Sequence, residues 1–148
     1  MKHWFCPDLE LENIYQITPE FLKAQGFKAV LSDLDNTIAD YDTPMPNDAM
    51  CEWIGAIQRE GIGFAIVSNN CKERVALFCS KLNIPFFWRS AKPLRIQIWR
   101  AMRVLGATRK NTCFIGDKFL TDVFGARRAG LYTIRVPSIK PRRKGKVK

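Results

Sequence analysis

The residues of this 148-residue chain whose types and spacing suggest chemistry stand just after short apolar runs. The run Ala29–Leu31 is followed by two aspartates one residue apart and then by a threonine. Later apolar runs are also followed by polar side chains. The full candidate set is Asp33, Asp35, Thr37, Ser68, Asn69, Lys92, Asp117 and Asp122. Ligands of parallel α/β sheets bind beyond the carboxyl ends of the strands, so these residues can converge although they are distant in sequence.

Together these residue types fit a site for phosphoryl transfer. A carboxylate such as Asp33 can attack phosphorus and form an acyl-phosphate. A divalent cation and fixed donors must then offset the repulsion between two negative groups. Asp33 and Asp117 would supply the oxygen ligands that Mg²⁺ prefers. Ser68 and Lys92 would contact phosphoryl oxygens, while Asp35 would protonate the leaving alkoxide and later deprotonate the attacking water.

Each group taken alone also has a purely structural interpretation. Asp-Asn-Thr sequences form turns and caps, so the first motif by itself fits a turn as well as a site. Ser68 and Asn69 alone fit a turn with a helix cap. Lys92 alone fits a surface lysine, and Asp122 fits an acid in the first turn of a helix. Four groups in order, each after an expected strand, favour a site.

Alternating apolar runs and helical patterns predict the elements that position these residues. Strands are expected at about 27–34, 63–67, 84–88, 112–115 and 131–136. Helices are expected at about 19–25, 48–60, 72–82, 93–105 and 121–129. Pro85 should keep the third strand short or near an edge, and Pro93 suits a first helical turn. The pattern predicts an α/β fold with a five-stranded parallel sheet and helices on both faces.

Segments outside this core differ in composition. Residues 1–27 should form an irregular arm and a short helix, capped by Thr18, that pack on a catalytic domain at 28–137. Residues 138–148 form a basic tail that we expect to be disordered. The start of the chain lacks the apolar core of a signal peptide. No apolar run approaches the roughly 20 residues that span a bilayer.

Charge is distributed unevenly. Residues 1–71 contain 4 Lys+Arg and 11 Asp+Glu, whereas residues 72–148 contain 20 and 3. The basic second half indicates an anionic partner, although a basic tail also serves solubility. The 5 cysteines are odd in number and form no Cys-x-x-Cys pair. With no secretion signal, this predicts reduced thiols in the cytoplasm rather than disulfides or zinc.

The motifs resemble those of the haloacid dehalogenase (HAD) superfamily. Residues 33–37 are similar to its first motif, Asp-x-Asp-x-Thr, and Ser68 and Lys92 resemble the second and third. Residues 116–122 are similar to the Gly-Asp-x-x-x-Thr-Asp form of subfamily IIIA. The resemblance implies a three-layer Rossmann-like fold and phosphatase activity.

The resemblance also implies a role for each acidic residue. Asp33 would be the nucleophile and a metal ligand. Asp35 would be the acid/base and would give its backbone carbonyl to Mg²⁺. Asp117 would be the other direct protein ligand, with Asp122 in support. Lys118, directly after Asp117, departs from the family's fourth motif, and the resemblance implies no role for it. The substrate phosphate would be bound by Thr37, Ser68, Asn69 and Lys92.

No cap domain fits between the motifs. Residues 37–68 hold a loop, one helix and one strand, and residues 68–92 hold one helix and a short strand. The open site suits a large substrate, unless a neighbouring subunit covers it. At a finer level the arm with Pro7, the helix start at Thr18 and the motifs resemble the YqeG-type branch of subfamily IIIA, which is related to phosphatidylglycerophosphate phosphatases.

We therefore predict a capless, Mg²⁺-dependent phosphomonoester hydrolase in the cytoplasm or at the inner membrane face. The favoured substrate is phosphatidylglycerophosphate or another phosphate on an anionic surface. The enzymatic alternative is a phosphatase of nucleic-acid ends or of a soluble metabolite. The alternative from another class is a basic nucleic-acid-binding protein with a vestigial site. The flank formed by Arg95, Trp99 and Arg103 could contact a membrane or nucleic acid, or Trp99 could pack at the edge of the core.

Overall fold

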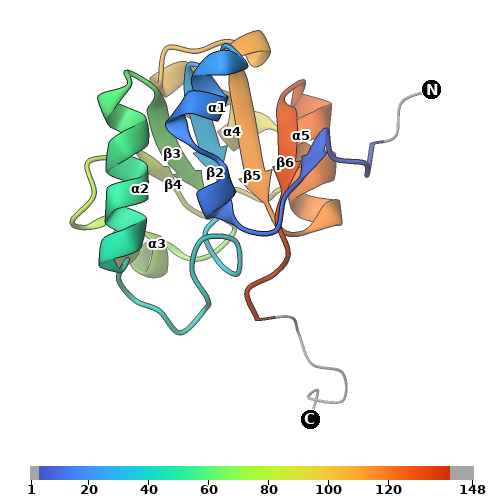
Figure 1. The fold of residues 1–148 in the computed structure, drawn as a ribbon. Coiled ribbons are helices and arrows are strands. Elements are labelled where there is room, and N and C mark those ends of the chain that lie inside the picture. Colours follow the sequence, from blue (N-terminus) through green and yellow to red (C-terminus); the bar gives the residue numbers. More distant parts are fainter. Residues whose placement is uncertain (1–3, 141–148) are drawn as a thin grey trace.

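Six parallel strands form the central sheet of the computed structural model, which describes residues 4–140 (Figure 1). The strand order is β1-β6-β5-β2-β3-β4. The strands are β1 Leu9–Glu10, β2 Ala29–Ser32, β3 Gly63–Val67, β4 Phe86–Phe87, β5 Thr112–Gly116 and β6 Tyr132–Arg135. Because all neighbours are parallel, their carboxyl ends share one edge of the sheet.

Helices cover both faces of the sheet (Figure 1). One face carries the short helix η1 Ile14–Gln16 with α1 Pro19–Ala24, α2 Asp48–Arg59 and α3 Lys72–Cys79. The other face carries α4 Ile96–Val104 and α5 Phe124–Ala129. Two further short helices are η2 Arg109–Asn111 and the π-helical turn η3 Phe119–Val123. The predicted three-layer α/β fold with a parallel sheet is confirmed.

The central strands divide their apolar side chains between two cores. In β2, Val30 packs in the core beneath α2 and α3, and its neighbour Leu31 packs beneath α4 and α5. Side chains of a strand alternate between faces, so a strand buried on both faces reads as an unbroken apolar run. All four residues of β2 are buried, which explains why its sequence shows no polar alternation.

The sixth strand is a difference from the expected five. Residues Leu9 and Glu10 lie in the segment predicted to be irregular, and they pair with Ile134 and Arg135 of β6. The side chain of Asp8 strengthens this pairing by accepting a hydrogen bond from the backbone N–H of Thr133 at 2.9 Å. A two-residue strand is too short to show a period of two, so the sequence pattern did not reveal it.

Two helix starts also differ from expectation. Helix α4 begins at Ile96 rather than at Pro93, because residues 91–94 form a turn in which Leu94 N–H donates to the carbonyl of Ala91 at 2.9 Å. The helix expected from residue 121 begins earlier, as the π-helical turn η3, and continues into α5. Strand β4 is short and lies at the sheet edge, as Pro85 led us to expect.

The flank of α4 packs against the protein. The indole N–H of Trp99 donates to the carbonyl of Ala129 at 3.1 Å, and the guanidinium of Arg95 lies 5.1 Å from the Trp99 ring centre. Trp99 thus packs at the edge of the second core. Edge packing of Trp99 is therefore observed, while contact of the flank with a membrane or nucleic acid stays a prediction.

The connections between strands leave no room for a cap domain. The chain from β2 to β3 forms a loop and α2, and the chain from β3 to β4 forms α3. Among residues 4–140, no helix is both long enough and apolar enough to cross a membrane.

Gly116 and Gly55 allow a matched test of how tightly the carboxyl end of β5 is packed. A Cβ at Gly116 would lie 2.3 Å from Cβ of Asp122, whereas at Gly55 in α2 the nearest atom, the Arg59 side chain, is 3.4 Å away. Gly116→Ala should therefore lower the free energy of unfolding by about 1–3 kcal/mol. Gly55→Ala should leave it unchanged or raise it by up to about 1 kcal/mol. Urea unfolding measures both, and equal effects would contradict the close approach.

Candidate active site

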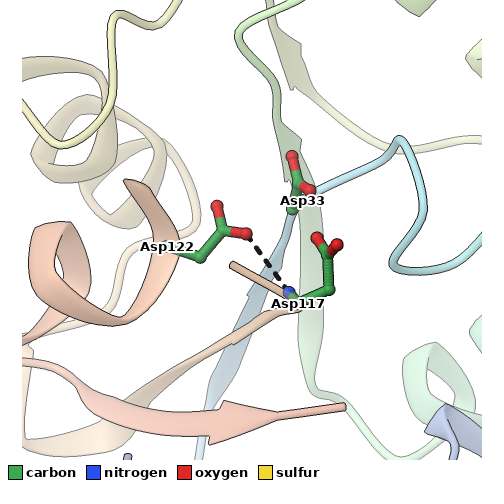
Figure 2. A group of neighbouring side chains, drawn as sticks. All are labelled: Asp33, Asp117 and Asp122. Atoms are coloured by element: carbon green, nitrogen blue, oxygen red, sulfur yellow. Dashed lines mark hydrogen bonds between the residues drawn. The ribbon is translucent and has the colours of Figure 1, made fainter. Parts of the chain in front are cut away.

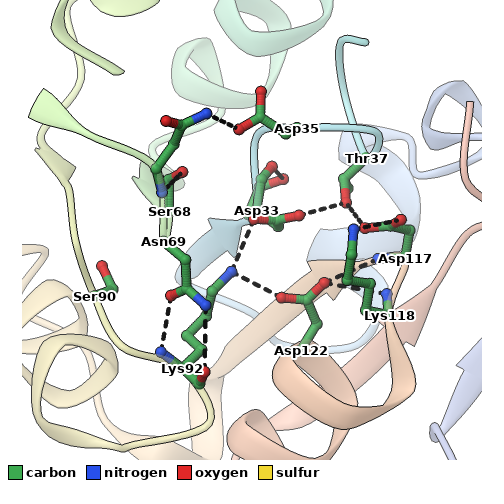
Figure 3. Close-up of polar contacts among 12 residues, drawn as sticks. Asp33, Asp35, Thr37, Ser68, Asn69, Ser90, Lys92, Asp117, Lys118 and Asp122 are labelled. Carbon is green, nitrogen blue, oxygen red and sulfur yellow. Dashed lines mark hydrogen bonds and ion pairs between the residues drawn. The ribbon is translucent and has the colours of Figure 1, made fainter. Parts of the chain in front are cut away.

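The predicted site residues meet at the carboxyl edge of the sheet (Figure 3). A cavity of about 280 Å³ opens there, between the loops that follow β2, β3, β4 and β5. It is lined by Asp33, Asp35, Tyr41, Ser68, Asn69, Asn70, Lys92, Lys118 and Thr121. Thr37, Asp117 and Asp122 lie behind this lining, in contact with it. The structure thus brings all eight candidate residues together.

A larger cavity, of about 490 Å³, lies under the same β2–α2 loop. Its walls include Ile14, Tyr15, Met50, Phe78 and residues 136–139, together with residues of the β2–α2 loop. None of the described residues that line it is a lysine or arginine, so this lining offers no cation to a phosphate. The smaller cavity is therefore the candidate active site.

The ammonium group of Lys92 lies between two carboxylates (Figure 3). Its Nζ is 2.8 Å from Oδ1 of Asp33 and 2.7 Å from Oδ1 of Asp122, and all three side chains are buried. Burial acts to lower the pKa of Lys92, but the charges of Asp122 and Asp33 outweigh it and hold the pKa above its usual value. Lys92 is therefore a permanent cation at the base of the cavity.

Asp33 is the most perturbed acid of the site. Burial is the main effect that raises its pKa to about 7, and the nearby charge of Asp122 adds to it, while Lys92 acts in the opposite direction. The group lies at the end of β2 with both oxygens in use: Oδ1 accepts from Lys92 and Oδ2 contacts the hydroxyl of Thr37. Perturbed, buried carboxylates of this kind are typical of functional sites.

Asp122 supports the site through both of its oxygens. Oδ1 contacts Lys92, and Oδ2 accepts hydrogen bonds from the backbone N–H groups of Asp117 and Lys118, each at 3.2 Å. The carboxylate packs so closely on Gly116 that no side chain fits there. Asp122 thus fixes both Lys92 and the backbone of the β5–η3 loop.

Three buried carboxylates could hold a metal ion: oxygens of Asp33, Asp117 and Asp122 lie within 4.8 Å of one another (Figure 2). They are not equivalent, because both oxygens of Asp122 are already used, by Lys92 and by two backbone N–H groups, whereas Oδ2 of Asp33 contacts only the hydroxyl of Thr37. The hydroxyl of Thr37 bridges the other two, at 3.0 Å from Asp33 and 2.8 Å from Asp117. One hydroxyl has a single hydrogen and can satisfy only one of these oxygens. The Asp33–Asp117 pair therefore fits a divalent cation.

Asp117 receives further support from the segment after β6. Ser138 Oγ donates to its Oδ2 at 2.5 Å, and Lys118 Nζ lies 3.4 Å from the same oxygen. Burial acts to raise the pKa of Asp117, but the hydrogen bonds from Ser138 and Thr37 and the charge of Lys118 outweigh it and hold the pKa below its usual value. Lys118, unexplained by the sequence, is therefore a partner of Asp117 at the cavity wall.

Residues 138–140 have defined positions, although we expected the disordered tail to begin at 138. The side chain of Asn36 brackets the backbone of Lys140: Nδ2 donates to its carbonyl at 2.8 Å, and Oδ1 accepts from its N–H at 3.1 Å. Ile139 N–H donates to the carbonyl of Asn36 at 3.0 Å. The loop that follows Asp33 thus holds the end of the described chain. Residues 141–148 of the predicted tail lie outside the described residues.

Asp35 lines the cavity beside Asp33 and is held by two residues of the next motif. Its Oδ2 accepts from Nδ2 of Asn70 at 2.7 Å, and its Oδ1 accepts from Nε of Arg74 at 3.0 Å. Arg74 also donates to backbone carbonyls of the β2–α2 loop, those of Thr43 and Asp40. Sequence reasoning missed Arg74, whose only signal is a basic residue in the first turn of the helix after Ser68.

Ser68 and Asn69 have different surroundings. The Ser68 hydroxyl accepts a hydrogen bond from the N–H of Asn70 at 3.0 Å, so its own hydrogen remains available to a ligand in the cavity. The Asn69 side chain pairs with the backbone of Lys92: its Oδ1 accepts from the N–H at 2.8 Å and its Nδ2 donates to the carbonyl at 3.2 Å. Asn69 thus holds the loop that carries Lys92.

Comparison with known proteins gives the same picture. The family model described as HAD-hydrolase-like matches residues 90–144. The chain is 40% identical over 136 residues to a Bacillus subtilis protein named probable phosphatase YqeG. The aligned region covers 92% of this chain and 79% of that protein.

Two solved structures share the fold at low identity. A Haemophilus influenzae deoxy-D-mannose-octulosonate 8-phosphate phosphatase, solved with cobalt, has a TM-score of 0.61 at 21% identity, over 76% of this chain and 69% of that one. An uncharacterized Listeria monocytogenes protein has a TM-score of 0.62 at 17% identity, over 79% of this chain and 84% of that one.

Lys92→Met should lower the free energy of unfolding by about 3–5 kcal/mol, because two buried carboxylates would lose their cation. Adding Asp122→Asn should recover part of that loss. The matched control is Lys23→Met, which removes an exposed ion pair with Glu60 and should cost less than about 1 kcal/mol. Urea unfolding in the presence of EDTA measures these values. Similar losses for Lys92→Met and Lys23→Met would contradict the assigned ion triad.

Proposed function

Because the chain belongs to the HAD superfamily, in the YqeG-type branch of its capless subfamily IIIA phosphatases, we propose that it hydrolyses phosphomonoesters with Mg²⁺ through an aspartyl-phosphate at Asp33. The observation that supports this proposal most is the position of Asp33. It stands at a strand end between a permanent cation, Lys92, and a second carboxylate that fits a divalent cation, Asp117.

The first step is attack of Asp33 on the phosphorus atom. A bond forms between a carboxylate oxygen of Asp33 and phosphorus, and the bond from phosphorus to the alcohol oxygen breaks. Lys92 and the Ser68 hydroxyl are placed to bind phosphoryl oxygens. When bound by Asp33 and Asp117, Mg²⁺ would offset the charges of the carboxylate and the phosphate and favour the ionised form of Asp33.

Asp35 is the residue we assign to proton transfer. It donates a proton to the departing alcohol oxygen and then takes one from the water that attacks phosphorus, which breaks the Asp33–phosphate bond and releases phosphate. Asn70 and Arg74 hold both Asp35 oxygens. Each of these oxygens accepts one hydrogen bond and keeps a second lone pair, which can carry the proton that Asp35 transfers.

Asn69 and Thr37 have positioning roles in this proposal, in place of the direct phosphate contacts first expected. Asn69 uses its carbonyl oxygen and an N–H to hold the Lys92 backbone. The Thr37 hydroxyl spans Asp33 and Asp117. Both residues thus act on the phosphate through Lys92 and through the metal-binding carboxylates.

The proposed substrate is phosphatidylglycerophosphate or another phosphate on an anionic surface. The site has no cap, and its cavity of about 280 Å³ lies at the lower end of small-molecule pockets. Such a cavity admits a phosphorylated headgroup and leaves the rest of a large substrate outside. The basic second half of the chain favours a substrate with an anionic surrounding.

Asp33→Asn should abolish hydrolysis of p-nitrophenyl phosphate, because the amide is a poor nucleophile. EDTA should likewise abolish the activity of the unmodified chain, and Mg²⁺ should restore it. Asp35→Asn tests the proton-transfer role. Because the nitrophenol leaving group needs little protonation, the variant should release one nitrophenol per enzyme in a burst. It should then stall, because Asp35 no longer activates the water. Substantial turnover by Asp33→Asn, or activity in EDTA, would rule out the mechanism.

The substrate class is tested by comparing kcat/KM for three phosphates. Phosphatidylglycerophosphate in phosphatidylglycerol vesicles should be hydrolysed at least about tenfold better than an oligonucleotide 3′- or 5′-phosphate or glycerol 3-phosphate, because only the vesicle meets the open, basic site as a surface. A preference for oligonucleotide ends would replace the lipid assignment and leave the mechanism intact.

A further inference from the structure

Several of the large apolar side chains that the described chain leaves exposed either line the active-site cavity or belong to segments that carry its lining residues. We define the apolar rim as Tyr41, Leu94, Ile96, Phe119 and Leu120. Tyr41 itself lines the cavity. Leu94 and Ile96 follow Lys92, and Phe119 and Leu120 stand between the two lining residues Lys118 and Thr121. These side chains are 42–66% exposed, which is costly in water without a partner.

The two main segments of the rim adjoin each other. A Cβ at Gly125 in α5 would lie 3.0 Å from Cα of Pro93, so the start of α5 touches the loop that leads into α4. Both α4 and α5 lie on the same face of the sheet and start from its carboxyl edge (Figure 1). Leu94, Ile96, Phe119 and Leu120 therefore belong to one region of the surface beside the cavity.

Cations accompany the rim segments that follow β4 and β5. One of them, Lys92, is buried and paired with Asp33 and Asp122, and Tyr41 of the rim lies between Asp40 and Asp42. Residues 89–96 and 118–121 contain Arg89, Lys92, Arg95 and Lys118, and no Asp or Glu. The guanidinium of Arg135 lies 4.1 Å from the ring centre of Phe119. On the β2–α2 side, Lys140 neighbours the acids of the loop, Asp40 and Asp42, at 3.5 and 3.9 Å. The rim thus combines apolar side chains with positive charge.

We propose that the apolar rim inserts into an anionic lipid bilayer and places the cavity over a phosphorylated headgroup; this inference rests on the proposed function. Whatever covers the rim also covers the cavity mouth, so the occupant must itself deliver the phosphate. A bilayer does so, because headgroup phosphates lie beside the apolar layer that receives the rim. Nearby cations add about 1 kcal/mol each at an anionic surface.

The test uses a rim variant and a matched control in the full-length chain. Ile96→Ser/Leu120→Ser removes rim side chains that are 66% and 60% exposed. Leu77→Ser/Val104→Ser removes side chains that are 50% and 60% exposed, from the middle of α3 and the end of α4. None of the four residues belongs to the catalytic machinery. Thermal unfolding should confirm that both double variants are folded.

Flotation with phosphatidylcholine vesicles, with and without phosphatidylglycerol, measures docking. The unmodified chain and the control should bind the anionic vesicles alike, and the rim variant should bind at least about tenfold more weakly, from the apolar area it no longer buries. All three should hydrolyse p-nitrophenyl phosphate at similar rates, while the rim variant loses activity on vesicle-borne phosphatidylglycerophosphate.

The inference would be overturned if the unmodified chain did not bind anionic vesicles, or if both double variants bound them equally well. It would also be overturned if the unmodified chain were a dimer that only the rim substitutions convert to monomers, while the rim variant still bound vesicles. The last would make a second copy of this chain the occupant. Failure of the proposed function has a different signature, because p-nitrophenyl phosphate hydrolysis would then be absent whether or not vesicles are bound.

Discussion

The site depends on one buried ammonium group. Lys92 balances Asp33 and Asp122, and without it two carboxylates would be buried with no cation between them. A cation taken out of water is itself costly, so each member of this triad is acceptable only because the others are present. Asn69 holds the Lys92 backbone, and the amides of the β5–η3 loop hold Asp122. The conformations of the Lys92 loop and of the β5–η3 loop therefore depend on the ion pairs among Lys92, Asp33 and Asp122.

The sheet supplies the geometry that the triad requires. Asp33, Lys92 and Asp122 come from loops after three different strands, and only the common edge of a parallel sheet brings those loops together. The close packing of Asp122 on Gly116 shows how little space separates the end of β5 from the turn η3 that carries Asp122. Because the connections between motifs are short, the same edge of the sheet remains open and no cap domain covers the cavity.

The fold and the main acids were predictable because their signals are local or ordered along the chain. A buried strand that ends in Asp33 and Asp35 fits a turn as well as a site on its own. The later motifs, in order along the chain, favour a site and predict different roles for these two acids. The sequence does not show where an amide or hydroxyl points, so the contacts of Asn69 with the Lys92 backbone and of Thr37 with Asp33 and Asp117 come from the structure alone. Arg74 and Ser138 were missed because a helix-surface arginine and a serine before a basic tail look ordinary. Strand β1 is too short for any period.

The hydrogen bonds between the Asn36 side chain and the Lys140 backbone link the loop after β2 to a segment that is synthesised much later. During synthesis the loop that follows β2 emerges early, but Asp117 lacks the hydrogen bond from Ser138, and Asn36 lacks its backbone partner, until nearly all of the described chain has been made. Among the described strands, β1 pairs with β6 alone, so its pairing waits equally long. Catalytic competence should therefore be acquired in one late event rather than built up motif by motif.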